Sequence, residues 1–197
     1  MKHNTAEVAA LKPDYLGFIF YEKSPRNFDL DQIPEIPENI KKVGVFVDAD
    51  LPFILDNIKK HQLEIVQLHG NETPDFCKRL KIALPQIQMW KVFSIKDTFD
   101  FSTLEAYETV VDKFLFDTKG KEKGGNGYTF DWSVLKNYPS TKPFILSGGI
   151  GVEVIPSVKE LVQSDLPIYA IDVNSKFEDE PGLKNIERLK LLLSDFS

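Results

Sequence analysis

Seven short apolar runs, separated by amphipathic stretches, organise the sequence. The runs are rich in β-branched and aromatic residues and begin 21 to 30 residues apart, at 15–20, 43–47, 64–68, 87–93, 113–117, 143–147 and 168–173. Most of them are continuously apolar rather than alternating, which is typical of parallel strands that are buried on both faces. The pattern therefore predicts seven parallel strands.

Helical patterns fill the intervals between these strands, at 51–61, 74–83, 130–137 and 183–193, and a further one, 5–11, precedes the first strand. Asp50, Thr73 and Thr129 stand directly before three of these patterns, as N-cap residues do. A proline-rich segment, 33–37, predicts an irregular connection rather than a domain boundary. We therefore predict a single domain over residues 1–197.

Repeated strand–helix units fit two architectures, an open doubly wound sheet and a closed (β/α)8 or TIM barrel. The length of 197 residues is close to the lower limit, about 200, for eight such units. The leading helical pattern has no predicted strand before it. The series therefore resembles a barrel whose first strand–helix unit contains only its helix. The predicted fold is an α/β TIM barrel that lacks its first strand.

Composition narrows the class of protein. Twenty-four basic and thirty acidic residues give a net charge of -6 without a dense basic cluster, which argues against nucleic-acid binding. The single cysteine cannot form an internal disulfide, and no apolar run approaches the roughly 18 residues of a membrane span. The first residues do not resemble a secretory signal. We expect a cytoplasmic protein with a small-molecule partner.

Chemistry-bearing residues stand just after the predicted strands, where parallel barrels build their sites. Gly148 and Gly149 follow one strand, and glycines there let backbone N–H groups surround an anion. Asn174 and Ser175 follow the next strand, and these two loops commonly share a phosphate. The sequence predicts a phosphate site, with a tight turn that binds nothing as the alternative.

Asp117 ends an apolar strand, so its carboxyl group is expected to be partly shielded from water. This shielding would raise its pKa toward the range in which a carboxyl group can act as a general acid. A helix N-cap or an ion pair with lysine 119, 121 or 123 is the alternative. The glycine-rich segment 124–127 predicts a flexible loop over this site.

Arg26 offers planar, bidentate recognition of a substrate carboxylate, and a surface pairing with Glu22 or Asp29 is the alternative. His69 is a candidate base or hydrogen-bond donor, although a lone histidine after a strand is more often structural, and no partner has metal-ligand spacing. Cys77 is expected to be a buried packing residue. Trp90 and Trp132 are expected in the core or in a cavity wall, because no basic groove accompanies them.

Taken together, the motifs resemble the phosphoribosylanthranilate isomerase family of tryptophan biosynthesis. The resemblance runs from about residue 8 to the C-terminus and rests on 17–20 with 24–26, 43–47, 66–70, 116–118, 124–132 and 147–150. It implies a TIM barrel and an Amadori rearrangement of N-(5-phosphoribosyl)anthranilate to the 1-amino-1-deoxyribulose phosphate. It implies neither a cofactor nor a metal, and the chain is expected to be a monomer or a homodimer.

The same resemblance assigns roles to individual residues. Asp117 would be the general acid that opens the furanose ring, Arg26 would hold the anthranilate carboxylate, and Asp172 would line the pocket near the sugar. The phosphate would lie among Gly148, Gly149, Asn174 and Ser175.

Two departures from the family pattern affect this reading. The stretch Asn174-Ser175-Lys176 stands where the family has Ser-Ser-Gly, and Lys176 changes the backbone preference of the loop. The family's first strand ends in a Cys-Gly motif whose cysteine is the general base, and this sequence begins beyond it. We hypothesise that Met1 is the internal methionine of that motif and that the chain as written is impaired. The alternative is a true family member whose missing strand is replaced from another molecule.

Two other classes of function stay open. A different phosphosugar enzyme, such as a ribulose-phosphate epimerase or an indole-glycerol-phosphate synthase, would need a metal-ligand set or a catalytic lysine at the strand ends. A catalytically silent barrel would keep the phosphate and carboxylate sites and bind without turnover.

Overall fold

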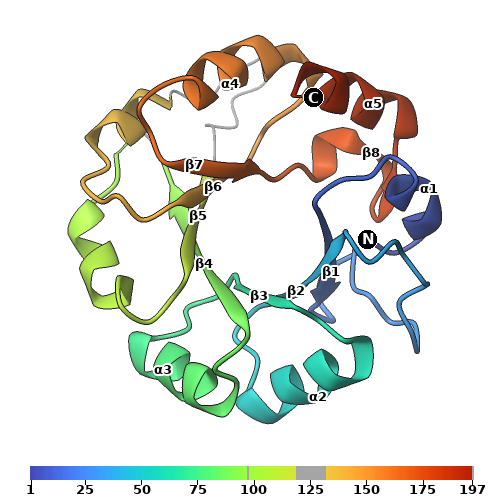
Figure 1. The fold of residues 1–197 in the computed structure, drawn as a ribbon, viewed down its shortest axis with the longest axis horizontal. Helices are drawn as coiled ribbons and strands as arrows, with labels where there is room; N and C mark the ends of the chain where they lie inside the picture. Colours follow the sequence, from blue (N-terminus) through green and yellow to red (C-terminus); the bar gives the residue numbers. More distant parts are fainter. Residues whose placement is uncertain (97, 119–131, 197) are drawn as a thin grey trace.

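A curled sheet of parallel strands forms the centre of the molecule (Figure 1). The structure is a computed structural model that describes residues 1–96, 98–118 and 132–196. Within these residues seven strands pair in the order of the sequence, each parallel to the next. Their bounds are β1 (Tyr15–Phe20), β2 (Lys41–Phe46), β3 (Ile65–Leu68), β4 (Gln88–Ile95), β5 (Lys113–Thr118), β6 (Phe144–Ser147) and β7 (Ile168–Ile171). The prediction of seven parallel strands in an α/β fold is confirmed.

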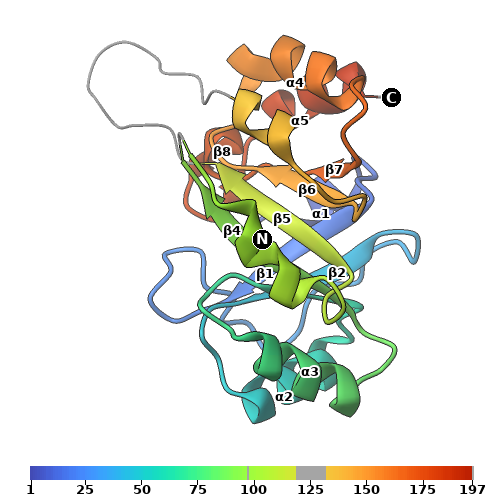
Figure 2. The ribbon, with the colours of Figure 1, turned by 90° about the vertical axis from the view of Figure 1, so that its left-hand side faces the viewer.

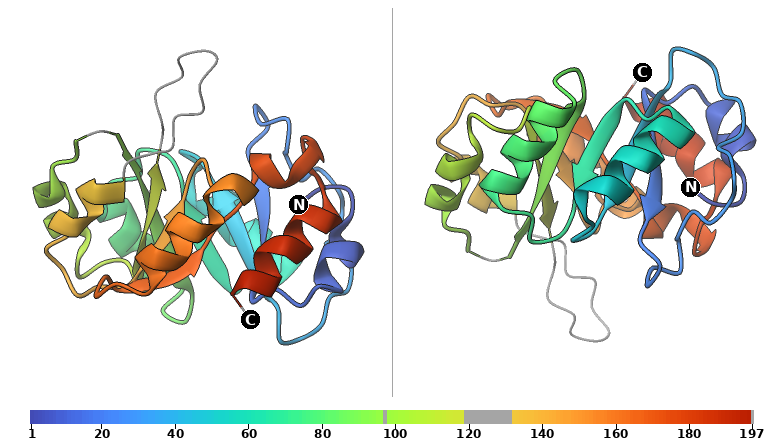
Figure 3. Two further views of the ribbon diagram at one scale, coloured as in Figure 1. Left: turned by 90° about the horizontal axis from the view of Figure 1, so that it is seen from above. Right: turned by 90° about the horizontal axis from the view of Figure 1, so that it is seen from below.

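Helices surround the sheet on its outer side, as the end-on view and the views from above and below show (Figures 1 and 3). The α-helices are α1 (Thr5–Ala9), α2 (Leu51–His61), α3 (Pro74–Ala83), α4 (Ile155–Val162) and α5 (Ile186–Asp195). Shorter 3-10 segments are η1 (Phe101–Tyr107), η2 (Trp132–Asn137), η3 (Val152–Val154) and η4 (Ser175–Phe177). Figure 2 shows α2 and α3 together at one end of the molecule and α4 and α5 at the other.

The N-cap residues explain why the sequence predicted the starts of α2 and α3 correctly. The side chain of Asp50 accepts a hydrogen bond from the Phe53 N–H at 2.8 Å, and Thr73 does the same for Phe76 at 3.2 Å. Both helices therefore begin where the caps indicated. Thr129 lies outside the described residues.

Two other helix predictions need correction. In the stretch 130–137, the described part is the 3-10 segment η2 rather than an α-helix. In the stretch 183–193, the chain first forms β9 (Leu183–Lys184), which pairs antiparallel with β8 (Glu178–Glu180). The helix α5 starts only after Asn185, whose side chain caps it. The proline-rich segment 33–37 is irregular, as predicted.

The two faces of the sheet bury two separate apolar clusters. On β5, Phe114 and Phe116 pack outward with residues from the helices, whereas Leu115 faces the interior of the ring. The other residues of the inner cluster are Val43, Ile65, Trp90, Val92 and Ile145. Because side chains alternate along a strand, every second residue of each strand points to the same interior.

Within the described residues, no strand pairs β7 with β1, so the sheet is open there, and the N-terminus and the β8–β9 hairpin lie in this region (Figure 1). The Met1 amine donates a hydrogen bond to the carbonyl of Gly17 on β1. The N–H groups of Lys2 and His3 donate to the carbonyl of Gly182 in the hairpin, at 3.3 and 3.1 Å. The N-terminal segment thus connects β1 to the hairpin.

Side chains add to this connection. The Asn4 amide bonds both the N–H and the carbonyl of Lys184, at 3.0 and 2.8 Å, and so replaces a short piece of strand ladder. At the other end of the gap, the hydroxyls of Tyr15 on β1 and Tyr169 on β7 lie 2.6 Å apart. Where a ladder is missing, hydrogen bonds from side chains and from the N-terminus therefore hold the two edge strands.

In a protein whose first residue is Met1, the buried amine makes the free energy of unfolding depend on pH. Burial, together with the nearby Lys184 charge, lowers the pKa of the amine from 8.0 to about 5. Between these values the unfolded chain binds a proton that the folded chain does not bind, so the free energy of unfolding rises from pH 5 to pH 8, by up to about 4 kcal/mol from this group. Urea unfolding at pH 5.5 and pH 8 should show this rise, and acetylation of Met1 should remove it. The same rise in the acetylated chain would contradict the prediction.

Candidate active site

The alternation of side chains along the strands places polar groups at one rim of the ring. On β3 and in the residue after it, Ile65, Gln67 and His69 share one face, and on β5 Asp117 follows the phase of Leu115. Gln67, His69 and Asp117 all line one cavity of about 690 Å³. These three residues mark the end of the cavity at the carboxyl ends of the strands, where parallel barrels place their sites; the cavity also reaches Tyr15 and Tyr169 near the amino ends of β1 and β7.

Asp117 and His69 face each other across this cavity. The Oδ2 atom of Asp117 lies 3.7 Å from Nε2 of His69, and the two side chains are 17% and 35% exposed. Nδ1 of His69 is within 3.2 Å of the Gln67 amide nitrogen. A carboxyl group beside an imidazole, partly shielded from solvent, can hold or move a proton. The lysines at 119, 121 and 123 and the glycine-rich loop 124–127 lie outside the described residues.

A buried ion pair fixes the loop that carries His69. The Glu72 carboxylate accepts hydrogen bonds from the N–H groups of Gly70 and Asp48, at 3.0 and 2.9 Å. It also lies 3.2 Å from the Lys91 ammonium, and both charged side chains are at most 3% exposed. Lys91 in turn donates to the Gly70 carbonyl at 2.8 Å. This pair, which the sequence analysis did not single out, therefore fixes the backbone directly after His69.

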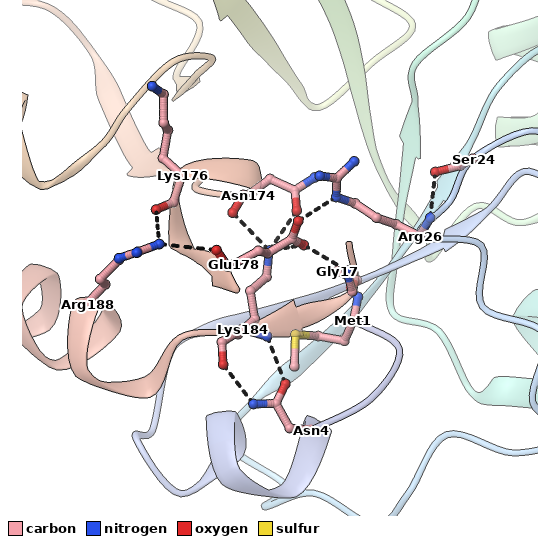
Figure 4. A network of polar contacts seen from close by, with 11 residues as sticks. Met1, Asn4, Gly17, Ser24, Arg26, Asn174, Lys176, Glu178, Lys184 and Arg188 are labelled. Carbon is pink, nitrogen blue, oxygen red and sulfur yellow. Dashed lines mark hydrogen bonds and ion pairs between the residues drawn. The ribbon is translucent and has the colours of Figure 1, made fainter. Parts of the chain in front are cut away.

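Arg26 pairs with Glu178 of β8 and with neither Glu22 nor Asp29, which the sequence analysis considered (Figure 4). The Nε atom of Arg26 donates to Glu178 Oε2 at 2.7 Å. Asp29 pairs with Lys2 instead. Arg26 lines the cavity, so the surface pairing was wrong, and the arginine reaches the same space as Asp117.

Glu178 carries a second cation. Its side chain is 4% exposed, and Oε1 accepts a hydrogen bond from the Lys184 ammonium at 2.9 Å. Burial alone would raise the pKa of Glu178, but the hydrogen bonds and charges of Lys184 and Arg26 outweigh it and hold the pKa below its usual value. Lys184 also bonds the side-chain oxygen of Asn174 at 2.6 Å. A continuous polar network thus joins Arg26 to Asn174 (Figure 4).

The glycine turn and the following loop form another part of the cavity wall. Gly148 and Gly149 have φ angles of 89° and 64°, which side chains other than glycine rarely adopt. Both line the cavity, as do Asn174 and Ser175. Lys176 stands in the 3-10 turn η4 and has no positive φ, so the loop does not need a glycine there.

Asp172 also lines the cavity and accepts a hydrogen bond from the Ser147 hydroxyl at 2.7 Å. All eight residues singled out in the sequence analysis as site residues therefore meet in one cavity: Arg26, His69, Asp117, Gly148, Gly149, Asp172, Asn174 and Ser175.

The remaining candidates have structural positions. Cys77 lies on α3 and is fully buried in the outer core, as predicted. Trp90 is a buried wall residue of the cavity, and Trp132 is buried in the outer core. Within residues 1–96, 98–118 and 132–196, no three His, Cys, Asp or Glu side chains form a group that could hold a metal ion. In the same part of the chain, no helix has the length and apolarity to cross a membrane.

The fold defines an α/β barrel protein, with a cavity lined by residues at the carboxyl ends of its strands. Solved structures agree with this class. A phosphoribosylanthranilate isomerase from Thermotoga maritima superposes with a TM-score of 0.82 at 30% identity, covering 99% of this chain and 94% of that one. A further phosphoribosylanthranilate isomerase structure, in complex with reduced 1-(o-carboxyphenylamino)-1-deoxyribulose 5-phosphate, superposes with a TM-score of 0.79 at 27% identity and the same coverage.

Sequence comparison specifies the family. The family model described as N-(5'phosphoribosyl)anthranilate (PRA) isomerase matches residues 2–195. N-(5'-phosphoribosyl)anthranilate isomerases from Parabacteroides distasonis and Campylobacter jejuni are 42% and 39% identical to this chain, over 95% and 98% of its length and 85% and 92% of theirs. The chain belongs to the N-(5'-phosphoribosyl)anthranilate isomerase family, whose members are isomerases of tryptophan biosynthesis.

The buried position of Cys77 predicts that its thiol is alkylated slowly in the folded protein. Burial raises its pKa to about 11, roughly two units above an ordinary thiol, so about 100-fold less thiolate is present at pH 8. Alkylation by iodoacetamide, followed by mass spectrometry, should be at least that much slower in the folded chain than in guanidinium chloride. Equal rates in the two conditions would contradict the buried assignment.

Proposed function

We propose that this chain binds N-(5'-phosphoribosyl)anthranilate and carries out the Amadori rearrangement to 1-(2-carboxyphenylamino)-1-deoxyribulose 5-phosphate. The observation that carries the proposal is the single cavity lined by Arg26, Asp117 and the turn of Gly148 and Gly149. These groups match the substrate's three parts, a carboxylate, a sugar ring and a phosphate. The family and the ligand named for a related structure support the same substrate.

Each group has a distinct role in this proposal. The Arg26 guanidinium holds the anthranilate carboxylate, and the phosphate lies among Gly148, Gly149, Asn174 and Ser175. Between them Asp117 protonates the furanose ring oxygen, so that the C1–O bond breaks and the amine lone pair forms the Schiff base. His69 and Asp172 contact the substrate beside the acid.

Completion of the reaction needs a base that removes the proton from C2 of the opened sugar. The chain contains one cysteine, Cys77, which lies on the outer helix α3 and does not line the cavity. We therefore expect this chain, as written, to bind its substrate but to turn it over slowly, because a positioned base typically contributes about 10²- to 10⁴-fold. The alternative of a silent ligand-binding barrel predicts binding with no turnover at all.

The setting of this activity is also a proposal. We expect a cytoplasmic enzyme that acts on a small molecule, as a monomer or as a homodimer like the phosphoribosylanthranilate isomerase of Thermotoga maritima, which is described as dimeric. That the chain binds no nucleic acid stays a prediction from its net charge of -6.

If Asp117 is the general acid, a change at this residue should lower turnover without weakening ligand binding. In a chain extended before Met1 by the family's first strand, which restores the general base, Asp117→Asn keeps the size of the side chain but removes the transferable proton. Turnover should fall about 10²- to 10⁴-fold, while the Kd of the reduced product analogue stays within about twofold. Steady-state kinetics and calorimetry measure the two effects. Asp165→Asn, on an exposed turn, is the matched control. Near-normal turnover of Asp117→Asn would remove this residue from the mechanism.

The missing base predicts a gain of function. Extension of the chain before Met1 by a short apolar strand ending in Cys-Gly should raise turnover by about 10²- to 10⁴-fold. The same extension with alanine in place of that cysteine separates the thiol from the structural effect of the strand. If both extended chains turn over equally, the thiol is not the base; if neither exceeds the original chain, the silent barrel is the better description.

A further inference from the structure

The orientation of Arg26 is fixed by a residue that does not itself line the cavity. The carboxylate of Glu178 accepts the Nε–H of Arg26 at 2.7 Å, and Figure 4 shows the terminal nitrogens of the guanidinium on the side away from Glu178. Among the described residues, Glu178 is the one acidic side chain that pairs with Arg26. A guanidinium has five N–H donors, so a contact through Nε leaves the edge formed by its terminal nitrogens for a ligand.

Every neighbour that bonds the Glu178 carboxylate is a donor. Oε2 accepts from Arg26, and Oε1 accepts from the Lys184 ammonium at 2.9 Å and from the Gly182 N–H at 3.3 Å. A carboxylate satisfies all three, whereas a glutamine of the same shape would turn its amide hydrogens against at least one of them. The position therefore requires a negative charge, which a neutral side chain of the same shape does not replace.

The network continues to the other end of the cavity. Lys184 donates to the side-chain oxygen of Asn174 at 2.6 Å and to its carbonyl at 3.2 Å. Arg188 supports the same loop by donating to the carbonyls of Lys176 and Glu178, at 3.3 and 3.1 Å. One buried carboxylate is thus linked to both Arg26 and Asn174, which line the same cavity.

We propose that Glu178 is a positioning residue for substrate binding. It holds the Nε edge of Arg26, so that the free edge faces the incoming carboxylate, and through Lys184 it fixes Asn174 at the phosphate end. This inference rests on the proposed function, and it adds that the β8–β9 hairpin sets the geometry between the two anionic ends of the substrate.

The test compares Glu178→Gln with Glu180→Gln, a matched change at an exposed position of the same strand. Anthranilate is the probe for the carboxylate end, and its Kd is measured by fluorescence titration. We expect about a tenfold weaker Kd for Glu178→Gln and a change within twofold for Glu180→Gln. An unchanged Kd in Glu178→Gln would overturn the inference. If the unaltered chain does not bind anthranilate, the proposed function fails first.

A double-mutant cycle separates positioning from a general effect on the fold. If Glu178 acts through Arg26, Glu178→Gln should have no further effect, within twofold, on the anthranilate Kd of the Arg26→Gln chain. Ligand-observed NMR extends this measurement to millimolar Kd values. A tenfold weakening in both backgrounds would show a structural role and would overturn the inference.

A second variant covers the case in which Glu178→Gln does not fold by circular dichroism. Glu178→Asp keeps a negative charge beside Lys184 but is one methylene shorter, so it should lose its reach to Arg26 and weaken anthranilate binding by about tenfold. A folded Glu178→Asp chain with the original Kd would overturn the inference.

Discussion

The phase of side chains along the strands is the constraint on which the rest of the structure depends. A parallel strand that is covered by helices on one side must turn every second residue into the ring. On β5 this rule places Leu115 in the inner core and carries Asp117 to the rim above it. On β3 it buries Ile65 in the inner core and turns Gln67 and His69 toward the same cavity. The acid and its imidazole neighbour meet because their strands share one phase.

At the open side of the ring, charged side chains have to be held in position without a strand ladder. Between β7 and β1 the side chains of Arg26 and Lys184 line the cavity, and the buried Glu178 carboxylate pairs with both of them. Buried ion pairs contribute little net stability, because loss of hydration offsets most of their attraction. These ion pairs instead fix the positions of the Arg26 and Lys184 side chains, since a carboxylate whose oxygens are all hydrogen-bonded allows its partners few alternative positions.

The sequence could predict those features that depend on neighbouring residues, such as helix caps and strand ends. Strand β1 and helices α2 and α3 were predicted with the bounds that the structure has, because Asp50 and Thr73 mark where the two helices begin. The eight residues proposed for the site could be found because each stands at the end of a predicted strand or in the loop that follows one. Glu178 could not be found in this way, since its bond to Arg26 joins residues 152 positions apart, and no periodicity carries such a pairing. Gln67 left a usable signal, a polar residue at an inward position of an apolar strand.

The arrangement also explains why one small hairpin matters for a large ligand. In the proposed complex the carboxylate and the phosphate occupy opposite ends of one molecule, and they are held by the segment after β1 and by the loops after β6 and β7. In the part of the chain that the structure describes, no strand ladder joins these elements, because β7 and β1 do not pair. A ligand that spans both ends gains from both only if their separation is fixed before it binds. The link from Arg26 through Glu178 and Lys184 to Asn174 crosses this opening, so it supplies the rigidity that the missing ladder would otherwise provide.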